Sequence, residues 1–178
     1  MKIGMILLLI ISVMLMFATA VYAQEGTTTS AAAIMKDTKG TTVGLATFTE
    51  EVGGLVRINV NVRGLTPGLH GIHIHNTGSC TGPSFTSAGE HYNPLGKEHG
   101  LNNPKGPHAG DLPNLEVGAD GTGHMNVTTD RVTLSPGLTT LFTANGTSMV
   151  VHAGPDDQMT NPAGNSGARI VCGVIERK

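Results

Sequence analysis

The sequence predicts an all-β domain, an eight-stranded antiparallel Greek-key β-sandwich or flattened barrel with two long functional loops. The first observation is the strict alternation of apolar and polar residues over 55–63, which is typical of a half-buried antiparallel strand. The second is the frequency of glycine, 25 of 178 residues, which divides Thr- and Val-rich segments into short strands and turns. The third is the lack of any convincing helical pattern. The length fits one domain with a real core, and no internal repeat indicates a second.

Eight short segments have the composition and the boundaries of strands. They cover residues 31–36, 41–50, 55–63, 69–76, 114–118, 124–130, 148–153 and 168–175. Two stretches between them, 77–113 and 154–167, are interrupted by glycine and proline and predict irregular loops. The first is long for a compact domain, so we expect metal ligation or a disulfide to order it.

The N-terminal residues 1–23 have the pattern of a secretory signal peptide. A positive start at Lys2 is followed by an almost wholly apolar run over 3–20 and by small residues where a signal peptidase would cleave. The alternative is an uncleaved membrane anchor, because the apolar run is near the lower length limit for a transmembrane helix. Residues 24–30 predict a flexible lead-in, and residues 31–178 form the domain. With either reading the domain lies in an oxidising compartment, periplasmic or extracellular.

The charge balance excludes two classes of partner. Removing Lys2 with the signal peptide leaves 10 of the 11 Lys and Arg residues against 13 Asp and Glu, a net charge of about −3. A chain without a basic excess has no electrostatic reason to bind nucleic acid or, once the signal peptide is cleaved, an anionic membrane.

Histidine is the residue type that carries chemistry in this chain. Six of the eight histidines lie between residues 70 and 108. His73 and His75 are two residues apart in an expected strand, so both imidazoles face the same side. Imidazoles with an aspartate close by are ligands that zinc and copper prefer. His70 and His124 have no metal role in this interpretation, since we expect His70 to bond to the backbone and His124 to lie on the surface.

Two metal sites are consistent with these side chains. Three imidazoles and one carboxylate make a closed tetrahedral zinc site, and the long loop offers His91, His99, His108 and Asp111. Four nitrogens favour copper(II), and His152 would complete such a set with His73, His75 and one histidine of the loop. If His91 served both sites, seven side chains would hold two metals.

These motifs resemble the copper/zinc superoxide dismutases of the secreted kind. The resemblance runs from about residue 31 to residue 175. Three segments carry it: Gly71-Ile72-His73-Ile74-His75, the ligand series from His91 to Asp111, and Gly164-Asn165-Ser166-Gly167-Ala168-Arg169-Ile170-Val171-Cys172-Gly173-Val174-Ile175. The family implies a β-sandwich that holds one copper and one zinc per chain.

The resemblance implies a ligand set for each metal. Copper would be held by His73, His75, His91 and His152. Zinc would be held by His91, His99, His108 and Asp111. His91 would therefore bridge the two metals.

Other residues match the family's motifs outside the ligand sets. Arg169 would hold the superoxide anion through its charge and its hydrogen bonds. Asp156 would link a copper-ligand histidine to a zinc-ligand histidine and fix their tautomers. Cys80 and Cys172 would form the family's disulfide, which agrees with an even pair of cysteines in an exported chain.

The implied activity is the conversion of superoxide to dioxygen and hydrogen peroxide by cycling of copper next to a structural zinc, which would protect an extracytoplasmic compartment. His91 and Arg169 would be the catalytic residues. The alternative is a non-catalytic copper/zinc-binding or copper-delivery protein on the same fold, although such relatives usually lack a copper histidine or the arginine. A zinc hydrolase is disfavoured, because a four-ligand zinc set leaves no open coordination position.

The chain departs from the best-known members of this family in two loops. Extra residues around 82–86 argue against relying on the eukaryotic kind of dimer interface, so homodimer and monomer both stay open. The loop 153–168 contains no Lys or Arg, whereas many relatives have a steering lysine there. We therefore expect the rate with superoxide to depend less on ionic strength than in those relatives.

Overall fold

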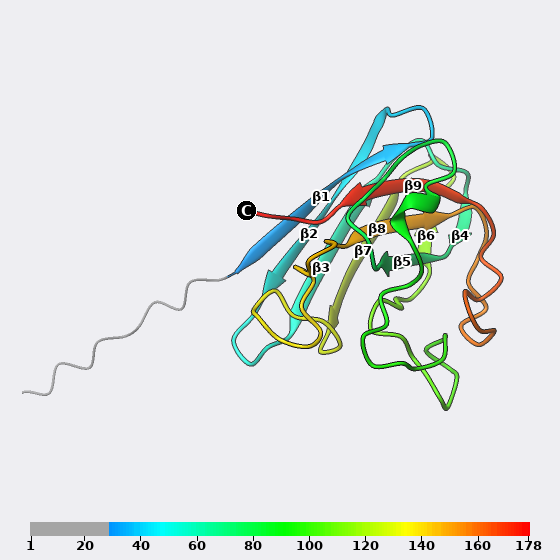
Figure 1. The fold of residues 1–178 in the computed structure, drawn as a ribbon. Coiled ribbons are helices and arrows are strands. Elements are labelled where there is room, and N and C mark those ends of the chain that lie inside the picture. The colour runs from blue at the N-terminus through cyan, green and yellow to red at the C-terminus, as the bar shows by residue number, and fades with distance from the viewer. Residues whose placement is uncertain (1–28) are drawn as a thin grey trace, which may run out of the picture.

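The structure, a computed structural model, describes residues 29–178 and consists of one antiparallel sheet that curls into a nearly closed barrel (Figure 1). The strands of these residues are β1 (Ser30–Asp37), β2 (Thr42–Glu50), β3 (Val56–Val62), β4 (Gly68–His70), β5 (Ile72–His75), β6 (Leu115–Val117), β7 (Gly123–Thr129), β8 (Ser148–His152), β9 (Arg169–Val174) and β10 (Glu176–Arg177). One turn of 3-10 helix, η1 (Thr86–Ala88), is the only helical element in the described part of the chain. The predicted all-β fold is confirmed.

The prediction of eight strands was wrong by two. The expected strand 69–76 is divided at Gly71 into β4 and β5, and β10 follows β9 to pair with β1. The strand order is β4-β6-β7-β3-β2-β1-β9-β8-β5, so β4 and β5 are consecutive in sequence but lie at opposite ends of the sheet. The chain changes its partner strand at Gly71, where a Cβ would lie only 2.7 Å from the Cβ of Ser166. Glycine is therefore required where the barrel comes together.

The core lies inside the barrel and follows the alternation predicted for β3. Val56, Ile58, Val60 and Val62 are at most 4% exposed, whereas the residues between them face outward. Ile58 pairs with Phe48 of β2, which is fully buried. Burying a side chain of this size contributes about 1.5–3 kcal/mol, so this face of the sheet holds the strands in register.

The connection from β7 to β8 crosses the end of the barrel, because β7 lies between β6 and β3 while β8 lies between β9 and β5. Leu134 and Leu141 of this connection are fully buried in the core. Glu50, at the end of β2, accepts hydrogen bonds from the backbone N–H groups of Leu134 (3.1 Å) and Ser135 (2.6 Å). These contacts hold the β7–β8 connection, a Greek-key connection as predicted, against the end of the barrel.

The disulfide Cys80–Cys172 ties the long loop after β5 to β9, with the two Cα atoms 5.6 Å apart. Phe85, Ala88 and Val150 pack with Cys172 as a small apolar cluster separate from the main core. The predicted pairing of these cysteines is confirmed. It closes a loop of 92 residues in sequence separation, which in the chain-entropy model stabilises the fold by about 4–5 kcal/mol.

The predicted signal peptide, residues 1–23, and nearly all of the lead-in lie outside the described residues. Over residues 29–178, the structure contains no helix with the length and apolar character needed to cross a membrane. The assignment of residues 31–178 to one domain stays a prediction.

Candidate metal centre

Strand β5, the last strand in the sheet order, carries His73 and His75 of the histidine cluster. It pairs with β8, whose last residue is His152. Ile72 and Ile74 point into the core, and the two histidines that alternate with them are fully buried. The predicted arrangement, with two imidazoles on one face of a strand, is therefore found, but both faces are buried.

The long loop runs back along β5 on its other side. Ile74 donates its backbone N–H to the carbonyl of Gly110 (2.9 Å) and accepts one from Tyr92 (2.8 Å). Isolated bridges also join His75 to His91 and His73 to Asp111. Gly110 must be glycine here, because a Cβ would lie 2.3 Å from the carbonyl oxygen of Ile74. The backbone itself thus brings the loop residues beside the strand residues.

One ring nitrogen from each of four histidines converges on a single region, where the four donor atoms lie within 4.8 Å of one another. These histidines are His73, His75, His91 and His152. The atoms Nδ1 of His73 and Nε2 of the other three are buried and have no hydrogen-bond partner. A buried polar atom without a partner costs about 1–3 kcal/mol, so four such atoms aimed together fit a bound metal ion.

The opposite ring nitrogens of this set are held by the protein. Nδ1 of His75 donates to the carbonyl of Gly89 (3.0 Å), and Nδ1 of His152 donates to the carbonyl of Gly167 (3.0 Å). Nε2 of His73 lies 2.7 Å from Oδ2 of Asp156. Because a carbonyl only accepts, the Nδ1 atoms of His75 and His152 carry the protons. Their Nε2 lone pairs are then free to bind a metal.

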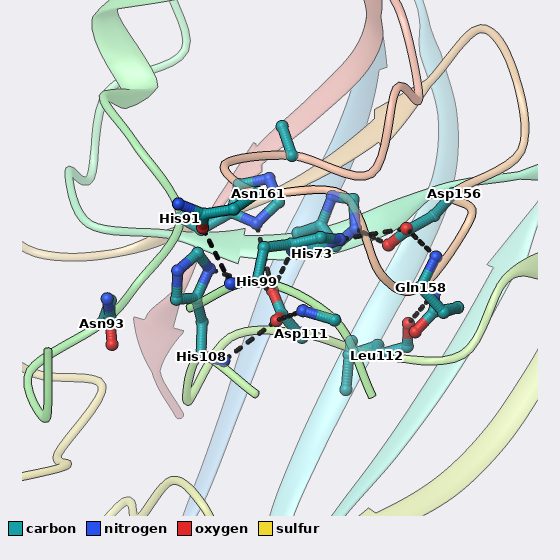
Figure 2. Close-up of polar contacts among 12 residues, drawn as sticks. His73, His91, Asn93, His99, His108, Asp111, Leu112, Asp156, Gln158 and Asn161 are labelled. Carbon is teal, nitrogen blue, oxygen red and sulfur yellow. Dashed lines mark hydrogen bonds and ion pairs between the residues drawn. The ribbon is translucent and has the colours of Figure 1, made fainter. Parts of the chain in front are cut away.

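A second set surrounds Asp111, which is fully buried (Figure 2). Its Oδ1 atom lies 3.0 Å from Nδ1 of His91, 3.0 Å from Nδ1 of His99 and 3.3 Å from Nδ1 of His108. Ligands on a tetrahedral zinc with bonds of about 2.0–2.1 Å lie about 3.3 Å apart. Oδ2 of Asp111 accepts the backbone N–H groups of Gly100 and His108, both at 2.9 Å. The carboxylate is thereby fixed with Oδ1 toward the three imidazoles.

His91 belongs to both sets. Its Nδ1 faces Asp111, while its Nε2 is among the four unpartnered nitrogens. Its ring centroid is 4.0 Å from that of His73. Grouping by donor-atom distance alone places His73 with His91, His99 and Asp111. The remaining nitrogens separate the sets differently, because Nδ1 of His73 converges with the three Nε2 atoms of the first set, whereas Nδ1 of His108 faces Asp111.

Asp156 links the two sets, because it contacts one histidine of each. Besides its contact with His73, its Oδ1 lies 3.0 Å from Nε2 of His99 (Figure 2). Asn114 holds the backbone of Asp156 through two hydrogen bonds of 2.8 Å, one in each direction. Gly164 passes so close that a Cβ there would lie 1.8 Å from Oδ1 of Asp156. The sequence predicted a role for Asp156 but not for Asn114 or Gly164. The only signal for Gly164 was that it is a glycine in an irregular loop, and Asn114 had no signal.

Burial keeps the first set of imidazoles neutral. Desolvation lowers the pKa of His73 to about 3, of His75 to about 2 and of His152 to about 4. Neutral imidazole is the form that binds a metal, so these residues need lose no proton at neutral pH.

The second set favours a cation. Burial opposes charge at His99, but the hydrogen bonds that it donates to Asp111 and Asp156 outweigh burial and raise the pKa of His99 to about 9. Burial would likewise raise the pKa of Asp111, yet the adjacent imidazoles of His108, His91 and His99 hold it well below its usual range. Two carboxylates thus compensate a positive charge here, which a proton or a metal ion can supply.

Arg169 lies at the start of β9, directly paired with His152 of β8. Its Nη1 donates to the carbonyl of Phe85 in the disulfide loop at 2.9 Å. The guanidinium is partly exposed, and within residues 29–178 that bond is its only hydrogen bond to the protein. Further donors therefore stay available for an anion beside the histidines.

The two remaining histidines behave as expected. His70 is buried, and its ring nitrogens lie 2.7 Å from the carbonyl of His152 and 2.8 Å from that of Thr66. His124 is exposed and contacts Asn61 on the outer face of the barrel. The structure brings the predicted metal ligands and Asp156 into one cluster, formed by β5, the last residue of β8 and the loops beside them.

Comparisons with known proteins agree with this cluster. Residues 42–175 match the family model described as copper/zinc superoxide dismutase (SODC). Copper-zinc superoxide dismutase 2 of Aquifex aeolicus (strain VF5) is 46% identical over 141 residues, covering 78% of this chain and 82% of the relative. The superoxide dismutase-like protein YojM of Bacillus subtilis (strain 168) is 45% identical over 139 residues, covering 77% and 71%.

Solved structures show the same fold. The crystal structure of a SOD-like protein from Bacillus subtilis is 43% identical, with a TM-score of 0.77 over 80% of this chain and 96% of that one. The clock protein EA4 is 32% identical, with a TM-score of 0.71 over 84% and 94%. With a family model that matches most of the chain and relatives above 40% identity, this chain belongs to the copper/zinc superoxide dismutase family, oxidoreductases whose metals are copper and zinc.

Proposed function

We propose that this protein is a working superoxide dismutase and not only a member of the fold. The observation that carries the proposal is the set of four buried, unpartnered imidazole nitrogens directed at one point, with Arg169 paired beside His152. A metal-binding protein needs the nitrogens alone. A partly exposed guanidinium with free donors next to them is suited to holding a small anion that approaches the same point.

The donor sets support one metal each. Four nitrogens suit copper, and we assign it to His73, His75, His91 and His152. Three nitrogens and a carboxylate suit zinc, and we assign it to His91, His99, His108 and Asp111. When bound, copper supplies one-electron transfer to and from superoxide, and zinc supplies a fixed positive charge.

The chain's own residues then position the anion and move the proton. Arg169 binds superoxide through donors that its bond to Phe85 leaves free. His91 holds its Nδ1 against Asp111, so Nε2 is the atom that can take up a proton and deliver it to the product. Asp156 keeps His73 and His99 in fixed orientations through both of its oxygens. Overall, two superoxide anions and two protons give dioxygen and hydrogen peroxide.

We place this activity outside the cytoplasm, in a periplasm or in the extracellular space. A disulfide between the loop and β9 persists in oxidising compartments and is rare elsewhere. The domain would then protect that compartment from superoxide.

The alternative is a non-catalytic copper/zinc-binding or copper-delivery protein. It is supported by the name of the Bacillus subtilis relative, which is called superoxide dismutase-like. Against it stands the complete set of four nitrogens and Arg169 in this chain.

Metal content and superoxide dismutation of the purified domain decide between the two. We expect one copper and one zinc per chain together with activity, and His152→Ala should retain zinc while losing activity. Both metals bound without dismutation would favour the alternative. Size-exclusion chromatography with light scattering on the same sample distinguishes homodimer from monomer.

A further inference from the structure

Each histidine of the two sets has at least one ring nitrogen directed at a proposed metal position. His108 is the only one of them whose other ring nitrogen, Nε2, neither faces a proposed metal position nor has a hydrogen-bond partner in the described part of the protein. Nε2 of His99 contacts Asp156, and Nδ1 of His75 and of His152 each bond to a carbonyl. His91 presents its two nitrogens to the two sets. Within residues 29–178, no hydrogen bond reaches Nε2 of His108. Its Nδ1 is also the farthest of the three from Oδ1 of Asp111, at 3.3 Å.

That difference affects how firmly the ring is held. A metal-bound histidine normally donates its second N–H to a carboxylate, a carbonyl or a water, and a fixed protein acceptor restrains the ring more than exchangeable solvent does. His108 is therefore held in place less firmly than His99, whose ring is fixed by Asp156. Of the three imidazoles around Asp111, His108 is the one that can turn away at the lowest cost.

A pocket of about 520 Å³ opens beside this ligand. His108 and His91 line it, together with Asn93, Lys97 and Asn161. Figure 2 shows His108 on the side of Asp111 that faces Asn93. His108 and His91 are 6% and 5% exposed, whereas His99 and Asp111 are fully buried. Among the four residues assigned to zinc, solvent therefore reaches those that line the pocket, and His108 is one of them.

We propose that zinc enters and leaves its site through this pocket, with His108 as the ligand that detaches first. The proposal rests on the zinc assignment made above. It adds a route and an order of ligand release, so the folded barrel can exchange zinc without opening β5 or the disulfide loop.

Filling the pocket tests the route. Lys97 lines the pocket, and it contacts Asn93 only through its backbone N–H and carbonyl, so its side chain can be replaced without losing those bonds. We expect Lys97→Trp to slow zinc release to a chromogenic chelator several-fold, measured on the zinc-loaded full domain. Lys97→Met removes the charge without filling the pocket, and Lys39→Trp adds the same bulk in the β1–β2 turn. Both should release zinc at the wild-type rate, and equal rates in all four proteins would overturn the route.

Chemical rescue tests the order of release. His108→Gly leaves a space that is continuous with the pocket, so free imidazole can enter and replace the missing ligand. We expect imidazole to restore zinc retention and the visible absorption spectrum of the cobalt(II)-substituted protein. His99→Gly, buried behind Asp156, should not be restored. Rescue of both variants, or of neither, would contradict the proposal.

The proposed function and the proposed zinc route can be disproved separately. If the wild-type protein with both metals does not dismutate superoxide but shows the expected release rates and rescue, the proposed function is wrong and the zinc route stands. If it dismutates but zinc release is insensitive to Lys97→Trp and rescue is unselective, only the route is wrong. Should His108→Gly fail to fold, the release rates still decide.

Discussion

Gly164 leaves room for the carboxylate of Asp156, and no other residue would: a Cβ at position 164 would lie 1.8 Å from Oδ1 of Asp156 and 2.6 Å from Nε2 of His99. That carboxylate oxygen makes the contact with His99 on which the rigidity of the zinc-side ligands depends. The glycine also has a φ of +60°, which L-residues rarely adopt.

We predict that Gly164→Ala displaces Asp156 and weakens zinc binding by about 10–100-fold, the usual effect of losing a ligand's outer partner. Gly167→Ala is the matched control, because Gly167 also has a positive φ, +80°, but has no atom within 4 Å of the added Cβ. Both variants pay about 1–2 kcal/mol of backbone strain. Competition with a zinc chelator should therefore separate them, and equal zinc affinities would show that the collision with Asp156 does not matter.

The disulfide should affect the position of Arg169 as well as the stability of the fold. Arg169 donates to the carbonyl of Phe85, and Phe85 packs in the loop that Cys80–Cys172 holds against β9. We predict that the double variant Cys80→Ser, Cys172→Ser loses about 4–5 kcal/mol of unfolding free energy in urea. Its kcat/KM for superoxide should fall while its zinc content is retained, because the loop no longer positions Arg169.

A matched control for the arginine's position is Lys39→Ser, a change at an exposed turn distant in sequence from the loop. It should leave unfolding free energy and kcat/KM unchanged. If the cysteine double variant lost stability but kept its kcat/KM, the loop would contribute to the fold without holding Arg169.

The dependence of the rate on salt should be weak. Residues 153–168 contain no Lys or Arg, so under the proposed function Arg169 would provide the attraction for superoxide near the site, with Glu90 as a nearby opposing charge. We predict that Met159→Lys, which adds a base to this loop at a side chain that is 49% exposed, raises kcat/KM at low ionic strength and steepens its fall with added salt. Val52→Lys, in the fully exposed β2–β3 turn, is the control. A steep fall in the wild-type protein would contradict the argument.

Local patterns predicted the strands well, because alternation and glycine-rich turns act over a few residues. The division at Gly71 was not predictable, since it depends on Ser166, which is close only after the barrel has formed. The candidate ligands were predicted from their residue types and the family resemblance, and the structure brings them together. The roles of Asn114 and Gly164, and the missing partner of His108, depend on contacts between distant loops that no spacing in the sequence encodes.

The metal-free protein should be most stable near pH 6.5. The pKa values of His73, His75 and His152 in the fold are about 3, 2 and 4, below the ordinary value of 6.5, so the unfolded chain binds more protons and stability falls as the pH drops below 6.5. The pKa of His99 is raised to about 9, so its stabilising contribution is complete below pH 6.5 and is lost as the pH rises through 9. Burial also lowers the pKa of His91, so four histidines with lowered pKa values against one with a raised value make the acid side steeper. Urea unfolding of the chelator-treated protein at pH 4.5, 6.5 and 9 should show this maximum, and a midpoint independent of pH would mean that the buried histidines are not held neutral.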